Sequence, residues 1–188
     1  MKKHDIKNIG LGCIKSLANT KYRVVVYIAN TPSMPEYQKC HYMQAMRKGE
    51  ITDIGIVCGN GWRKVFNVYS KLLYALDADN FSFKTCGHSW QDYRDNFLLQ
   101  QNSGTALLFS PPLLQNNTNC IHIISGKTYA KTLMESELLN ASLIWLDESF
   151  AIDIKNRLLV CPYFDYRQLS NQKIERLALL IHELITSN

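Results

Sequence analysis

The sequence predicts an α/β protein in which helices cover both faces of a mainly parallel central sheet. Apolar runs of strand length, such as residues 22–29 and 157–162, alternate along the chain with amphipathic helical patterns. These runs are apolar at nearly every position, which is typical of strands buried on both faces. A chain of 188 residues can bury a substantial core within one domain. We therefore expect residues 1–188 to form a single three-layer αβα domain.

The first half of the chain contains one clear strand and one clear helix. Residues 22–29 form a β-branched run, and a Pro-rich turn leads from it into an expected helix at about 36–48. Residues 51–59 fit either a second strand or an irregular entry to the next helix. Apolar side chains at 3–4 spacing predict a helix over 62–76. Cap-like polar residues predict another from about residue 89 to residue 101.

The second half continues the alternation of strands and helices. The expected elements are strands at 105–110, 120–125, 142–147 and 157–162, a helix at 128–136, and a last helix that begins at Ser170 or Asn171. His122 lies inside one of these strands, so we expect it to be a hydrogen-bonded core histidine and not a catalytic base. No repeat or low-complexity tract interrupts the pattern.

Charge and cysteine content limit the possible functions. The net charge is +5, and residues 1–48 carry nine Lys and Arg against two Asp and Glu. A basic segment of this kind can face nucleic acid or another polyanion, or it can be an ordinary solvated surface. The six cysteines contain no CxxC pair, which favours buried free thiols over a metal site. Cys86 and His88 lack a second pair of ligands for zinc, so we expect no metal and no cofactor.

The chain contains no apolar run near the roughly 18 residues that a membrane span needs. Its start is basic, but charged and polar residues interrupt the next apolar stretch, so it is a poor signal peptide. We therefore expect a cytoplasmic protein with no membrane partner.

Ligands of parallel α/β sheets bind beyond the carboxyl ends of the strands, so the loops after the strands are the places to search for a site. Asn30 directly follows the strand 22–29. Arg63 and Lys64 lie in the first turn of a helix, where the helix dipole disfavours cations unless an anion is near. Gly126 and Lys127 form a similar strand-to-helix turn, although the upstream Gly of a phosphate-binding P-loop is absent.

The loop 162–170 is unusually rich in large and charged side chains. It contains Tyr163, Phe164, Asp165 and Arg167, whereas short connections are usually built from Gly, Asn, Asp and Ser. Exposed aromatic rings beside an Arg suit base stacking, and they also suit a protein interface. Asp165 and Arg167 can be a structural ion pair, or Asp165 can orient Arg167 or act as a base. We expect this loop to form one wall of a cleft whose facing walls contain Asn30 and Asn60.

The order of these loops resembles the uracil-DNA glycosylase superfamily, and in particular its mismatch-specific branch. "YIANTPS" is similar to the family's Gly-Ile-Asn-Pro-Gly loop and aligns Asn30, although it lacks the flanking glycines and inserts Thr31. "GNGWRKVF" is similar to the family's Asn-x-Phe-Trp helix start and aligns Asn60 and Trp62. "IISGKTYA" and "VCPYFDYRQLSN" occupy the places of two later loops. The sequence also resembles small uncharacterised bacterial families.

The resemblance implies an αβα fold over residues 22–185 and a role in base hydrolysis. Asn30 would position the attacking water, and Lys127 and Arg167 would contact phosphates. A cleft lined by the other candidates would hold an extruded base. We group Asn60, Trp62, Arg63, Tyr163 and Phe164 with these two cations as substrate-binding residues, and Asn30 with Asp165 as catalytic ones.

Two other functions are also consistent with the sequence. The chain can be an enzyme that acts on a nucleotide or a phosphorylated small molecule through the turns at Arg63 and Lys127. It can also be a non-catalytic protein that works through protein contacts. A stable homo-oligomer that buries Tyr163 and Phe164 would favour the last of these.

Overall fold

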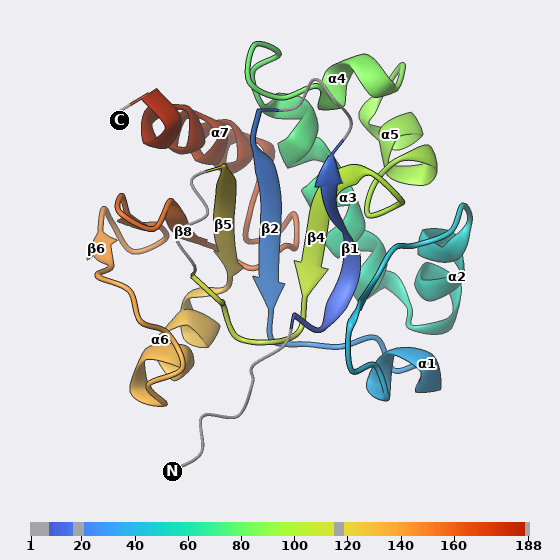
Figure 1. Cartoon of the computed structure of the whole chain (residues 1–188), viewed down its shortest axis with the longest axis horizontal. Helices are drawn as coiled ribbons and strands as arrows, with labels where there is room; N and C mark the ends of the chain where they lie inside the picture. Colours follow the sequence, from blue (N-terminus) through green and yellow to red (C-terminus); the bar gives the residue numbers. More distant parts are fainter. Residues whose placement is uncertain (1–7, 17–20, 115–118, 187–188) are drawn as a thin grey trace.

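The structure, a computed structural model, describes residues 8–16, 21–114 and 119–186 (Figure 1). Its strands are β1 (Gly10–Ser16), β2 (Arg23–Ile28), β3 (Met43–Gln44), β4 (Ser103–Leu108), β5 (Cys120–Ser125), β6 (Ile144–Trp145), β7 (Ala151–Asp153) and β8 (Leu158–Cys161). Its helices are α1 (Pro35–Gln38), α2 (Glu50–Val57), α3 (Asn60–Ala75), α4 (Phe83–Cys86), α5 (Trp90–Asn96), α6 (Lys127–Glu135) and α7 (Asn171–Thr186).

All eight strands belong to one sheet with the order β3-β1-β4-β2-β5-β8-β7-β6. The four central strands, β4, β2, β5 and β8, run parallel to one another. Antiparallel pairs stand on both sides of them, with β1 beside β4 at one side and β7 and β6 beyond β8 at the other. The predicted α/β class and mostly parallel sheet are therefore confirmed.

Helices cover both faces of the central strands. One face packs its alternate residues, including Val26 and Ile123, against α3 and α7. The opposite face presents Val25, Ile124 and Val160 to Ala130 and Leu133 of α6. Such two-sided burial explains why β2 and β5 are apolar at most positions. In Figure 1, the carboxyl ends of β2, β4 and β5 point to the bottom of the view, near the start of α6.

Strand β1 was not expected from the sequence, because two glycines interrupt its apolar pattern. Because neither glycine has a side chain, the backbone of β1 can lie close to that of β4, and the strand forms through this pairing. A Cβ atom added to Gly12 would lie 2.3 Å from the Thr105 carbonyl oxygen, and one added to Gly10 would lie 2.3 Å from that of Leu107. Both glycines have positive φ values, +125° and +156°, and a side chain would prevent this close pairing with β4.

Two segments in the first half of the chain differ from what the sequence predicted. The helix expected at 36–48 is only the single turn α1, because Met43 and Gln44 pair with Gly10 and Leu11 at the edge of the sheet. Residues 50–57 form the helix α2, and neither the strand nor the irregular entry to the next helix is found. Ile51 and Ile54, three residues apart, are buried on one side, so the apolar residues follow helical and not strand periodicity.

The second half follows the prediction more closely. Strand β5 has the expected bounds, and α6, α7 and β8 differ from the expected ranges by one or two residues. Strand β7 was missed because it has only three residues, and of the strand expected at 142–147 only the two residues of β6 are found.

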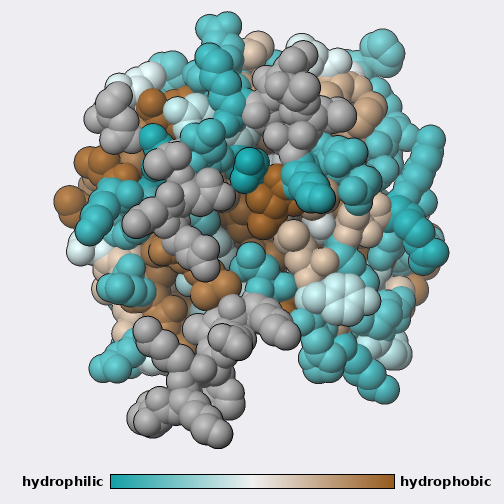
Figure 2. Space-filling model, viewed as in Figure 1, coloured by the Kyte–Doolittle hydropathy of each residue, from teal (hydrophilic) through white to brown (hydrophobic). Residues whose placement is uncertain are grey.

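Figure 2 shows hydrophilic residues over most of the viewed face, with hydrophobic residues in smaller areas. Among the described residues, no helix is long and apolar enough to cross a membrane.

Candidate functional site

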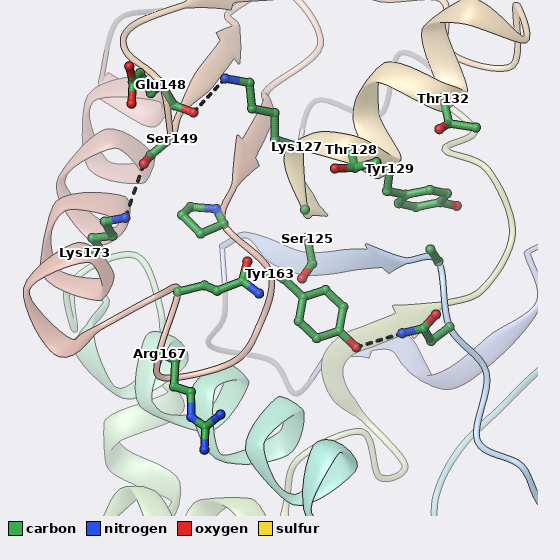
Figure 3. Close-up of a pocket in the computed structure, with 15 residues that line it drawn as sticks. Ser125, Lys127, Thr128, Tyr129, Thr132, Glu148, Ser149, Tyr163, Arg167 and Lys173 are labelled. Carbon is green, nitrogen blue, oxygen red and sulfur yellow. Dashed lines mark hydrogen bonds between the residues drawn. The ribbon is translucent and has the colours of Figure 1, made fainter.

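A cavity of about 810 Å³ lies at the carboxyl ends of β2, β5 and β8. Ala29 and Asn30 after β2, Ser125 and the start of α6 after β5, and Pro162 and Tyr163 after β8 all line it (Figure 3). The chain leaves β2 for helices on one face of the sheet and leaves β5 for α6 on the other. The cavity thus lies at the topological switch point, where ligands of open α/β sheets bind. Its volume is within the range of small-molecule sites.

Two hydrogen bonds hold the walls of this cavity together. The backbone N–H of Phe164 donates to Ser125 Oγ over 3.0 Å, which ties the loop after β8 to the end of β5. Across the cavity, Asn30 Nδ2 donates to the Tyr163 hydroxyl over 3.2 Å (Figure 3). This bond uses the Tyr163 oxygen as an acceptor, so its O–H proton and the Asn30 Oδ1 atom stay available to a ligand.

Three cations and one carboxylate line the cavity, namely Lys127, Arg167, Lys173 and Glu148. Lys127 Nζ donates to the backbone oxygen of Glu148 over 3.0 Å, and Lys173 Nζ donates to Ser149 Oγ over 3.3 Å (Figure 3). Both acceptors are neutral, so these contacts position the ammonium groups without compensating their charge. The Arg167 guanidinium forms no hydrogen bond or ion pair with any residue that the structure describes. The cavity is therefore positively charged.

Two tyrosine rings border the turn between β5 and α6. A Cβ atom added to Gly126 would meet the Tyr163 ring at 3.8 Å and the Tyr129 Cβ atom at 4.0 Å. Burial raises the pKa of both tyrosine hydroxyls, so they remain protonated hydrogen-bond donors at neutral pH. Gly126 itself has φ +110°, a conformation that residues with a side chain rarely adopt. The turn at Gly126 therefore lies beside two tyrosines that both line the cavity.

Asp165 does not line the cavity, because its carboxylate is engaged on the other side of the loop. Lys64 Nζ donates to Oδ2 over 2.8 Å, and the backbone N–H of Arg167 donates to Oδ1 over 2.9 Å. Burial raises the Asp165 pKa, but the bonds from Lys64 and Arg167 outweigh it and lower the pKa overall. A carboxylate held in this state is a weak base. Asp165 thus bonds to the backbone of Arg167 and not to its guanidinium, and Lys64 takes the place of Arg167 as the ion partner.

Two of the predicted substrate-binding aromatics belong to the core. Phe164 is fully buried and packs edge-on against Tyr69, with ring centroids 5.8 Å apart. Trp62 is 8% exposed and packs against Phe66 and Phe109. Neither ring reaches the cavity, and Phe164 cannot be buried by an oligomer because this chain already buries it. The hydrophobic gain of burying a large aromatic ring explains both positions.

Asn60 and Arg63 lie in a different cavity, between α2, α3 and α5. Asn60 therefore does not form the expected facing wall. Successive side chains along a helix point about 100° apart. In the first turns of α3, Lys64 therefore faces the loop 162–170, whereas Asn60 and Arg63 face α2. The turn from β5 to α6 takes the place of that wall.

Sequence reasoning missed several residues that line the cavity. Thr128, Tyr129 and Thr132 lie in the first turns of α6. Their position soon after a buried strand is the sequence feature that could have identified them. Lys173 lies in the first turn of α7, although it is several residues beyond the end of β8. Ser149 and Glu148 belong to the turn between β6 and β7, which the sequence did not place beside β8.

Two further expectations concern charge and metal. Lys2, Lys3 and Lys7 of the basic N-terminal segment lie outside the described residues. The described cations of residues 1–48 do not line the cavity at the switch point. Within the described ranges, no three His, Cys, Asp or Glu side chains gather as the ligands of a metal ion.

The fold and the cavity define an α/β protein with a small-molecule-sized site at the switch point of its sheet. The chain belongs to a family of unknown function, DUF6942, whose model matches residues 15–182. No curated protein and no solved structure matches the chain.

Proposed function

We propose that this protein binds a nucleotide-like small molecule, with a phosphate group and a planar ring, in the cavity at the switch point. The observation that carries the proposal is the uncompensated positive charge. Lys127 and Lys173 donate to neutral oxygens. The Arg167 guanidinium forms no hydrogen bond or salt bridge with a described residue, although the Asp165 carboxylate is near enough to interact with its charge. A phosphate would supply the missing negative charge and accept charge-assisted hydrogen bonds.

The remainder of the cavity suits the organic part of such a ligand. Tyr129 and Tyr163 both line the cavity, where a planar ring can contact aromatic side chains. Asn30 Oδ1 and the Tyr163 O–H offer one acceptor and one donor to the polar edge of a ring. A few polar groups placed in a partly apolar cavity are what small-molecule sites use for specificity.

Isothermal titration calorimetry with uridine and adenosine 5′-monophosphates, the parent nucleosides and inorganic phosphate tests this proposal. We expect the monophosphates to bind more tightly than the nucleosides. Arg167→Gln should weaken monophosphate binding by about tenfold or more, because a charge-assisted hydrogen bond contributes about 1.5–3 kcal/mol. Arg47→Gln, which removes an exposed charge outside this cavity, should leave it unchanged. Equal effects of the two variants would contradict the proposal.

A second candidate function is the hydrolysis of a base from nucleic acid, which the position of Asn30 favours. The resemblance to the uracil-DNA glycosylases implies that this residue holds a water, and its Oδ1 atom is available for that role beside a cavity large enough for a base. Release of free base from a DNA duplex with a mismatched uracil tests this candidate. Binding of DNA that weakens steeply with salt, with base release lost in Asn30→Ala, would support it. Absence of both would exclude it in favour of the small-molecule function.

A further inference from the structure

A second cavity, of about 590 Å³, lies between α2, α3 and α5. It shares no lining residue with the cavity at the switch point. Asn60, Arg63 and Asn67 line it from α3, and their spacing of three and four residues places them on one face of that helix. Thr52 and Ile56, four residues apart, line it from α2. The two helices thus form opposite walls of the cavity.

Arg63 has a packed stem and an unpaired head. A Cβ atom added to Gly55 of α2 would lie 2.6 Å from Arg63 Cγ, so the absence of a side chain at Gly55 lets the stem of Arg63 lie directly against α2. Glycine inside a helix lowers stability by about 1 kcal/mol relative to alanine. The contact with Arg63 gives Gly55 a packing role that accounts for its place in α2. The Arg63 guanidinium nevertheless forms no hydrogen bond or ion pair with any described residue. Arg63 is an exposed residue, so packing directs a guanidinium whose donors face solvent and are open to a ligand.

A second guanidinium and an oriented amide complete the polar wall. Arg94 donates to Asp95 through Nε over 2.7 Å and through Nη2 over 2.9 Å, and it donates to Asn67 Oδ1 through Nη1 over 2.5 Å. Because Arg94 occupies the oxygen of Asn67, the Nδ2 donors of this amide are left for another acceptor. Among the residues that the structure describes, no carboxylate lines the cavity. Its polar groups are therefore mostly donors, and Arg63 gives it an uncompensated positive charge.

We propose that this cavity is a second anion site that takes the phosphate group of a small phosphorylated molecule. The Arg63 guanidinium donates to two phosphate oxygens, as its planar fork allows, and Asn67 Nδ2 and the Thr52 hydroxyl donate to the others. Ile51 and Ile56 border the organic part of the ligand. The site is separate from the cavity at the switch point and does not depend on the function proposed for it.

Nuclear magnetic resonance of the full chain, titrated with inorganic phosphate, tests the proposal, because backbone amide shifts report the two cavities separately. We expect saturable shifts at Gly59 and Gly61 in the millimolar range. Arg63→Gln should weaken this binding by about tenfold or more. Gly55→Ala changes no charge and favours the helix. It should nevertheless weaken phosphate binding, by less than Arg63→Gln does, because its methyl group displaces the stem of Arg63.

Arg47→Gln is the matched control, since it removes one exposed cation outside this cavity. It should leave the shifts at Gly59 and Gly61 unchanged. Shifts confined to the amides of residues 126–129 would overturn the proposal, because only the first cavity would then bind phosphate. Shifts at Gly59 and Gly61 that do not saturate, or that Arg63→Gln and Gly55→Ala leave unaltered, would overturn it as well.

Discussion

Lys64 Nζ lies 2.8 Å from Asp165 Oδ2, and this ion pair joins the first turns of α3 to the loop after β8. The two side chains are 11% and 21% exposed, so water screens the pair less than it screens a surface pair. The Lys64 ammonium group also lies 4.9 Å from the centre of the Tyr166 ring. This pair therefore fixes the loop whose residues Tyr163 and Arg167 line the cavity.

We expect Asp165→Ala to lower the free energy of unfolding by about 1–3 kcal/mol, because it leaves a mostly buried ammonium group unpaired. Urea unfolding of Asp165→Ala, Lys64→Met and the double variant measures the coupling between the two side chains. A coupling energy below about 0.5 kcal/mol, as for exposed pairs, would show that the ion pair does not fix the loop. The exposed pair of Arg47 and Glu50, whose atoms are 4.0 Å apart, is the matched control.

Asn30→Ala should change ligand binding and leave stability almost unaltered. The Asn30 side chain is exposed and its bond to the Tyr163 hydroxyl spans 3.2 Å, so we expect a loss below about 0.5 kcal/mol in the free energy of unfolding. The rise in melting temperature that a bound nucleoside monophosphate produces should disappear. Tyr163→Phe removes the same bond but keeps the ring, and it should retain part of that rise. A large loss of stability in Asn30→Ala would show that the residue is structural.

His122 should make the protein less stable below neutral pH. It is buried beside Tyr27, whose hydroxyl lies 2.8 Å from Nδ1, and burial lowers the pKa of His122 to about 4. The unfolded chain, with an ordinary pKa near 6.5, binds the proton first as the pH falls. Stability contributed by the neutral imidazole is therefore present above the unfolded pKa and is lost between about pH 6.5 and pH 4.

This loss should amount to about 2 kcal/mol between pH 7 and pH 5. His122→Gln cannot titrate, so its free energy of unfolding should fall by that much less over the same range. Carboxylates such as Asp165, whose pKa is lowered, contribute equally to both proteins and cancel in the comparison. Identical slopes for wild type and His122→Gln would refute the assignment.

Gly12→Ala should destabilise the protein by about 3 kcal/mol or more. Its methyl group would lie 2.3 Å from the Thr105 carbonyl oxygen at φ +125°, so both overpacking and backbone strain oppose it. Gly61→Ala is the control, because an added Cβ atom there meets nothing within 4 Å. We expect that variant to be neutral or slightly stabilised in urea unfolding. Similar stability of the two variants would mean that β1 can move away from β4.

The sequence predicted the central strands because their burial on both faces leaves a continuous apolar run. It could not predict β1, β3 or β7, because two or three residues carry no periodicity and because Gly10 and Gly12 weaken the pattern. These strands form through pairing with residues far away in the chain, as Met43 does with Gly10. Helix α2 was ambiguous because eight residues with few polar positions fit two periods.

The candidate site shows the same division between local and distant information. Asn30, Lys127, Tyr163 and Arg167 line one cavity because each follows a parallel strand, and strand ends meet at one edge of the sheet. The first turn of α3 was harder to place, because the direction of each side chain depends on how the helix is rotated against the sheet. That rotation follows from the packing of Trp62 and Phe66, and it sends Arg63 and Lys64 to opposite sides.

The sheet order sets a constraint on how this chain acquires its structure. Strands β1 and β2 come first in the sequence but lie on either side of β4, where Gly12 pairs with Ala106 and Val24 pairs with Thr105. On its other side, β2 pairs with β5. Such pairing between distant segments makes loop closure costly and slows folding. During synthesis, a chain that ends before Ser103 contains both N-terminal strands but not the one that joins them, so the sheet can assemble only after more than half of the protein has been made.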